Sequence, residues 1–393
     1  MIQLSTKHGN APASAYAYAA YGMILCGDGE SERGYRIGRM ALDLVEKLQA
    51  RDLKCRVYFL YSAGVHHWKQ HARESTDYLT HAYQAGLESG DLEYVAAVIF
   101  LLTASALWVG HKPLKEVLSD FDRFANPLYR TGQKQVIQLV QMGRQYISNL
   151  QGGSRNRTRL SGERFHEEET AEFWKETRYG DGLYYLNLFK TSLADMFGQY
   201  DQALDFARKA EENGELQKAT LSHPALELHR GLSAGALAGQ PKADRKKLLE
   251  AFDASMSRIE SFAKNSPDNF KHMHLMLRAE RARLDARHGD AIPLYDEAIE
   301  TARSQGFHLD EAHANELAAS YFSGLGQRKF ALLYVREARA IYGALDITAK
   351  VEEIENHFPE LVRGSQMSGS GSLAQAGGFD FQTIVKAAAS ISG

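Results

Sequence analysis

Residues 198–210 read GQYDQALDFARKA, and residues 326–338 read GQRKFALLYVREA. Each stretch places a Gly-Gln turn before small or medium side chains at helical spacing. Three places in the chain share this spacing: Ala203, Ala207 and Ala210; Ala291, Tyr295 and Ala298; Ala331, Val335 and Ala338. Small residues at these positions let two antiparallel helices approach closely and stack on a neighbouring pair. The pattern therefore predicts a helical repeat array, and a surface of this kind usually binds other protein segments.

The helical pattern extends outward from these stretches in both directions. Helices are predicted at 11–25, 31–49, 54–72, 74–88, 92–109, 111–125 and 131–150, as pairs at 183–197 with 200–213, 224–238 with 242–264, 269–288 with 290–305 and 309–325 with 327–344, and at 347–356. The unit length of about 40–44 residues exceeds the roughly 34 of an ideal tetratricopeptide repeat. We therefore expect an all-α fold of tetratricopeptide-like antiparallel helix pairs, stacked as a right-handed solenoid.

Two stretches interrupt the helical pattern and suggest a domain organisation. Residues 152–170 read GGSRNRTRLSGERFHEEET, and residues 363–378 read RGSQMSGSGSLAQAGG. Glycine-rich polar sequence of this kind is typical of connections and linkers. The expected units are N-terminal repeats at 1–150, an exposed connection at 151–178, C-terminal repeats at 179–361, a Gly/Ser linker at 362–378 and the start of a truncated helix at 379–393. The arginines of the connection allow a nucleic-acid site as an alternative, but no aromatic platform accompanies them.

The bulk composition indicates a folded chain in a reducing compartment. Of its 393 residues, 44% are hydrophobic and 24% are charged, and the formal charge of −3 gives no overall attraction to nucleic acid. Cys26 and Cys55 are too few for a disulfide framework or a zinc site, and both lie in apolar helical patterns. They are predicted to be buried thiols.

The apolar run Val95–Val109 reads VAAVIFLLTASALWV and is the one stretch that resembles a membrane span. It is shorter than the roughly 20 residues that a spanning helix needs. A fully buried helix in the middle of the array explains it better. Because residues 1–10 also lack the apolar core of a signal peptide, we expect a cytoplasmic protein without membrane insertion.

The candidates for catalysis or metal binding are weak. His67 and His71 have the spacing of a two-histidine metal site, but the residues between them lack the glutamate of a zinc-hydrolase motif, so a polar helix surface is expected. The GLSAG sequence at 231–235 resembles a nucleophile elbow, yet Ser233 falls inside a predicted helix instead of after a strand. No phosphate-binding loop occurs in the sequence. The sequence predicts no catalytic residue, no cofactor and no metal site.

Aromatic side chains recur at helical spacing in the C-terminal repeats. Packing between helix layers is their expected role, and a groove for a peptide or helix is the alternative. The residues that would line such a groove are Tyr184, Tyr185, Phe189, Tyr295 and Tyr321.

Five segments carry a resemblance to a known group of proteins: residues 24–48, 66–96, 186–204, 311–345 and 349–361. They are similar to the tetratricopeptide-like region of very large bacterial signal-transduction kinases. In those proteins a serine/threonine kinase-like module and an AAA-type ATPase precede the helical region, and a GAF sensor domain and a histidine kinase follow it. The tail FDFQTIVKAAASISG resembles the helix that leads toward the GAF domain. None of the family's catalytic or sensor motifs falls within this chain.

The resemblance implies a non-catalytic region that binds protein segments and relays signals between neighbouring modules of a sensor kinase. A free-standing adaptor that recognises a peptide or protein partner is the alternative. An enzyme with an unrecognised helical active site is the third, and it requires a cleft with perturbed acids or histidines.

Overall fold

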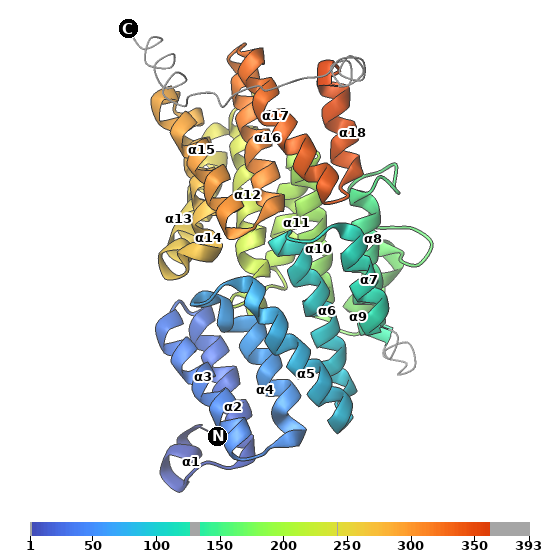
Figure 1. The fold of residues 1–393 in the computed structure, drawn as a ribbon, viewed down its shortest axis with the longest axis vertical. Helices are drawn as coiled ribbons and strands as arrows, with labels where there is room; N and C mark the ends of the chain where they lie inside the picture. Colours follow the sequence, from blue (N-terminus) through green and yellow to red (C-terminus); the bar gives the residue numbers. More distant parts are fainter. Residues whose placement is uncertain (1, 126–133, 242, 362–393) are drawn as a thin grey trace, which may run out of the picture.

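The computed structural model describes residues 2–125, 134–241 and 243–361. The predicted linker at 362–378, the predicted helix at 379–393 and the predicted helix end at Asn126-Pro127 lie outside these ranges. Within them the regular structure is α-helix with short 3₁₀ segments and no strand, so the expected all-α class is confirmed (Figure 1).

The N-terminal helices from α2 onward form at the predicted places except within 54–72, and α1 was not predicted. Their bounds are α1 Ile2–His8, α2 Pro12–Gly27, α3 Ser31–Lys47, α4 Arg51–Gly64, α5 Ser75–Ser89, α6 Leu92–Val109, α7 Leu114–Ala125 and α8 Lys134–Leu150. Proline at the first position of α2 costs no hydrogen bond there, and glycines in the left-handed conformation end α5 and α6.

The C-terminal helices from α10 to α18 match the predicted helices within a few residues, whereas α9 lies in the segment predicted as a connection. Their bounds are α9 Glu167–Glu176, α10 Gly180–Met196, α11 Tyr200–Glu211, α12 Ser222–Ala238, α13 Arg245–Asn265, α14 Pro267–Leu284, α15 His288–Gln305, α16 His308–Gly324, α17 Arg328–Ala344 and α18 Thr348–His357. The small side chains that defined the repeat pattern, such as Ala203, Ala291 and Ala331, are fully buried. They lie where consecutive helices approach each other.

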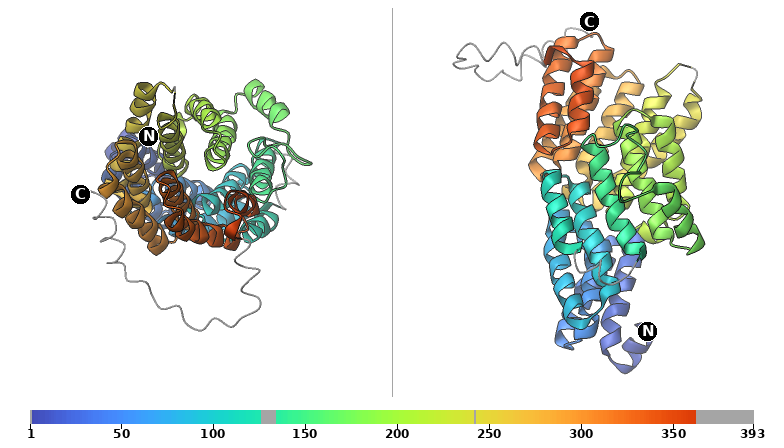
Figure 2. Two further views of the ribbon diagram at one scale, coloured as in Figure 1. Left: turned by 90° about the horizontal axis from the view of Figure 1, so that it is seen from above. Right: turned by 90° about the vertical axis from the view of Figure 1, so that its right-hand side faces the viewer.

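The helices pack as sequential antiparallel pairs with a second set of contacts between alternate helices. From α2 to α16, each even-numbered helix contacts the next even-numbered helix, whereas odd-numbered helices mainly contact their neighbours in the chain. We call the even-numbered set the inner layer. Viewed along the long axis, the helices from α10 to α18 follow a curve, and α18 returns to pack against α8 (Figure 2).

Helix α6 is the hydrophobic helix of the Val95–Val109 run, and its predicted burial is confirmed. It is the one helix in the described ranges that is long and apolar enough to cross a membrane. However, 72% of its span is buried inside the protein, where it packs against α4, α5, α7 and α8. The two cysteines are likewise buried, and burial raises the pKa of both thiols to about 12.

The prediction of one helix over 54–72 was wrong. Helix α4 ends at Gly64, and the chain continues as two 3₁₀ turns, η1 His66–Trp68 and η2 Ala72–Glu74. This segment packs against the C-terminal repeats: the Trp68 indole N–H donates to the Ala219 carbonyl at 2.9 Å, and Asn269 bonds to its backbone. Long-range contacts therefore override the local helical pattern.

The segment 65–74 also joins the two halves of the molecule. In Figure 1, α2–α5 lie below the C-terminal helices, and this segment runs between the two groups. The Asn269 amide of α14 accepts from the Ala72 N–H and donates to the carbonyls of His67 and Gln70, at 2.7–2.9 Å. The N- and C-terminal repeats are thus held together by buried hydrogen bonds.

The prediction of an exposed connection at 151–178 was also wrong. Leu160, Phe165 and Trp174 are buried in the hydrophobic core, and the segment includes helix α9. The fully buried Asn149 of α8 donates to the carbonyls of Arg157 and Arg159, both at 2.9 Å. Buried aromatic side chains and backbone hydrogen bonds give this glycine-rich stretch a defined path.

Candidate functional site

A cavity of about 590 Å³ opens on the inner layer of the N-terminal half. It lies between α2, α4, α6 and α8, and the start of α10 and the 3₁₀ turn η4 Glu215–Gln217 close one end. Its walls are mainly apolar and include Met23, Phe59, Phe100, Leu101 and Leu139. Volume and lining are typical of sites that bind small molecules or side chains of a partner.

Two large apolar side chains lie at the open rim of this cavity. Ile24 is 58% exposed and Leu216 is 72% exposed, and both line the cavity. An exposed apolar rim that continues into an apolar hollow is a feature of protein interaction sites.

A short polar chain forms one end of the cavity. The Tyr185 hydroxyl donates to Gln217 Oε1 at 2.9 Å, and Gln217 Nε2 donates to Asp181 Oδ1 at 2.8 Å. Burial raises the pKa of the Asp181 carboxyl, and the hydrogen bond from Gln217 opposes this rise. Because Asp181 also lies in the first turn of α10, the helix dipole favours its charged form. The carboxylate can therefore accept a hydrogen bond from an N–H group of a ligand.

A second polar pair lies on the wall formed by α2 and α6. The hydroxyls of Tyr16 and Tyr94 are 3.1 Å apart, and the guanidinium of Arg56 lies 4.7 Å from the centre of the Tyr94 ring. Among the described residues that line the cavity, none is a histidine or a cysteine. The arrangement offers binding and orientation, and it lacks the paired nucleophile and base of acyl-transfer enzymes.

The five aromatic residues predicted to bind a partner are buried, with exposed fractions between 0% and 7%. Their expected packing role describes most of them: Phe189 stacks on Tyr146, Tyr295 donates to Glu280, and Tyr321 bonds to His288. Tyr184 is also fully buried. Tyr185 is the member of the set that lines the cavity, so partner contact stays a prediction for this residue.

The two histidines considered for a metal site do not share a helical face. His67 is fully buried in η1, whereas His71 bonds to the Gln305 carbonyl at 3.0 Å. The expected polar helix surface is therefore wrong for His67. A different set, Asp195, His229 and His313, brings its ligand atoms within 4.8 Å of one another. Sequence reasoning missed this set because its members come from three helices spread over more than a hundred residues.

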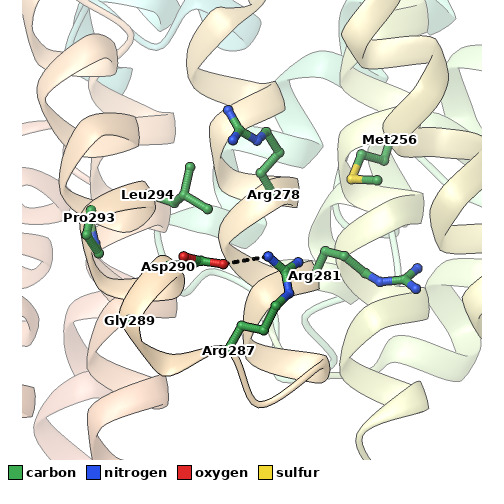
Figure 3. Close-up of a pocket in the computed structure, with 8 residues that line it drawn as sticks. All are labelled: Met256, Arg278, Arg281, Arg287, Gly289, Asp290, Pro293 and Leu294. Atoms are coloured by element: carbon green, nitrogen blue, oxygen red, sulfur yellow. Dashed lines mark hydrogen bonds and ion pairs between the residues drawn. The ribbon is translucent and has the colours of Figure 1, made fainter. Parts of the chain in front are cut away.

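A hollow of about 460 Å³ between α13, α14 and α15 is lined by three arginines (Figure 3). Arg281 forms ion pairs with Asp253 and Asp285, and Arg287 pairs with Asp290 at 2.7 Å. Two of the three cations are therefore neutralised by neighbouring carboxylates, and this hollow is a weaker candidate for anion binding than its arginine content suggests.

No protein-family model and no curated protein matches this chain.

Proposed function

We propose that this chain is a non-catalytic helical-repeat module that binds protein segments through the inner-layer cavity. In this proposal the helix pairs form a right-handed tetratricopeptide-like solenoid, and the inner layer is its binding face. The observation that carries the proposal is the apolar cavity, because its rim exposes Ile24 and Leu216 while Asp181 lies at its end.

The lining defines the chemistry of the partner segment. Apolar or aromatic side chains would enter between α4, α6 and α8, since these walls offer no charged group that must lose water. A backbone N–H or a cationic group would meet the Asp181 carboxylate. This combination fits a peptide or helix that presents two or three apolar anchors and one donor.

The resemblance to bacterial sensor kinases suggests what the binding achieves. In that setting the module would couple an upstream ATPase or kinase-like module to a downstream sensor and histidine kinase in the cytoplasm. The 65–74 segment supports coupling, because it links the cavity-bearing half to the C-terminal repeats through Asn269. A free-standing adaptor would use the same cavity, and the coding sequences beside this one distinguish the two.

Filling the cavity tests the proposal. Ala97 of α6 is half-buried in the lining, and Ala97→Trp would place an indole in the space meant for a partner. Tagged residues 1–361 are used to retrieve proteins from the native host, and the indole should abolish or strongly reduce retrieval. The control is Ala254→Trp, which adds the same side chain at an exposed position of α13.

The refuting outcome is equal retrieval by the wild type and the folded Ala97→Trp variant. For the relay, deletion of 179–361 from a full-length sensor kinase should alter regulated autophosphorylation. Unchanged regulation after that deletion would exclude the coupling role while leaving the adaptor role open.

A further inference from the structure

Three inner-layer helices bring a carboxylate and two imidazoles together in the C-terminal half. Asp195 lies near the end of α10, His229 on α12 and His313 on α16. Asp195 Oδ2 lies 2.8 Å from His229 Nδ1 and 3.9 Å from His313 Nε2, and the two imidazole rings stack with centroids 6.1 Å apart. The three potential ligand atoms converge on one point in space.

The surroundings hold this group in place. Ser233 donates to the other carboxylate oxygen, Asp195 Oδ1, at 2.7 Å, so Oδ2 is left facing the two imidazoles. Such a hydrogen bond outside the ligand set fixes a carboxylate ligand at metal sites.

The charges around the group favour a cation. Within the described residues, the ion pairs of Asp195 are with the two histidines and with no lysine or arginine. Lys350 also acts electrostatically on His313, but its ammonium forms ion pairs with Glu316 at 2.6 Å and with Glu353 at 2.7 Å. The Asp195 carboxylate is therefore available to offset part of the charge of a divalent ion.

We propose that Asp195 Oδ2, His229 Nδ1 and His313 Nε2 form a binding site for a divalent transition-metal ion of the zinc class. Zinc bonds to nitrogen and oxygen of roughly 2.1 Å place neighbouring tetrahedral ligands about 3.4 Å apart. The separations from Asp195 Oδ2 are 2.8 and 3.9 Å, and all three ligand atoms lie within 4.8 Å of one another, so side-chain shifts of about an ångström would bring them to that spacing.

Binding would replace the hydrogen bond between His229 and Asp195. The ring proton of His229 would then lie on Nε2, and the freed Nδ1 lone pair would coordinate the ion. The side chains of His229 and His313 are 11% and 9% exposed, and a water molecule would supply the fourth ligand. Two histidines, one carboxylate and water are a ligand set that zinc and cobalt both accept.

The test uses tag-free full-length protein, stripped with a chelator and titrated with Zn²⁺ or Co²⁺ alone. We expect one tightly bound equivalent per chain. The Co²⁺ complex should show the visible bands of tetrahedral coordination without a thiolate charge-transfer band, which separates this site from Cys26 and Cys55. Asp195→Asn and His313→Gln should each weaken binding by at least 10-fold.

A matched control is the second buried histidine–aspartate pair. His272 Nε2 lies 2.8 Å from Asp310 Oδ2, and the described residues place no third ligand group beside them. His272→Gln should leave the stoichiometry and the Co²⁺ spectrum unchanged.

Three outcomes would overturn the proposal: no bound equivalent in the wild type, a spectrum with sulfur coordination, or equal loss of binding in the control variant. If a site variant fails to fold, the metal stoichiometry and the Co²⁺ spectrum of the wild-type protein still test whether the site exists. Each outcome is separate from the retrieval experiment on the N-terminal cavity.

Discussion

Replacing Asn269 by alanine should weaken the contact between the N- and C-terminal halves more than a substitution of a surface residue does. The Asn269 side chain is fully buried and makes hydrogen bonds to three backbone groups of the 65–74 segment. A buried hydrogen bond contributes about 1 kcal/mol net, so three of them contribute about 3 kcal/mol.

The final cost depends on which backbone groups lose their last partner. The carbonyl of His67 keeps a second donor, the Ser266 hydroxyl at 2.9 Å, and Gln70 lies where water can reach it. The Ala72 N–H is buried and its acceptor is Asn269, so the loss of this one bond costs about 1–3 kcal/mol in place of the about 1 kcal/mol counted above. We therefore expect Asn269→Ala to lower the free energy of unfolding by about 3–5 kcal/mol.

Urea unfolding followed by tryptophan fluorescence measures this change. Trp68 is 2% exposed within the same segment, so its share of the emission of the three tryptophans should change when 65–74 is released. The control is Asn315→Ala, which removes one hydrogen bond to the Glu311 carbonyl inside a single helix and should cost less than about 1 kcal/mol. A loss below 1 kcal/mol in Asn269→Ala, or an equal loss in both variants, would refute the reasoning.

Two further predictions concern pH and backbone geometry. Burial lowers the pKa of His66 to about 4 and of His67 to about 3, so the unfolded chain binds more protons. The free energy of unfolding should be highest above the unfolded-state pKa of about 6.5, and it should fall by about 2 kcal/mol per imidazole between pH 7 and pH 5. Urea midpoints that do not change with pH would contradict this prediction. Gly110→Ala should destabilise more than Gly90→Ala, although both glycines have positive φ and end a helix. A Cβ added at Gly110 would lie 2.9 Å from the backbone nitrogen of Leu309, whereas a Cβ added at Gly90 would meet no atom within 4 Å. Thermal unfolding should therefore show a loss of stability of about 1–2 kcal/mol for Gly90→Ala and a clearly larger loss for Gly110→Ala. Equal losses in the two variants would exclude a role for the contact with Leu309.

The helices were predictable because their signals are local. Small residues at 203, 207 and 210, and their equivalents at 331, 335 and 338, have helical spacing whatever lies next to them. The burial of Val95–Val109 could also be inferred, since a long apolar run without a charged side chain is unfavourable on a surface that faces water.

The two failures at 65–74 and 151–178 have one physical cause. In both segments the stabilising partners are distant in sequence: Trp68 bonds to Ala219, and Leu160 and Trp174 enter a core built from several helices. Local propensity contains no information about those partners.

The candidate sites show the same division. The aromatic spacing around Tyr184 and Tyr185 predicted packing. The helical pattern alone could not show that Tyr185 lines the cavity whereas Tyr184 is fully buried. Asp195, His229 and His313 carry no shared motif, because the spacing between them is determined by helix lengths and loops rather than by one element.

The sequence by itself determined the all-α class, the bounds of most helices to within a few residues and the pairing of consecutive helices. Helix formation depends on side chains three or four positions apart, and short turns force neighbouring helices to lie side by side. Only the tertiary structure decided how α18 returns to α8, how 65–74 joins the halves and which side chains meet in the two sites. Those features depend on contacts between side chains that are distant in the sequence, which the local helical signals do not encode.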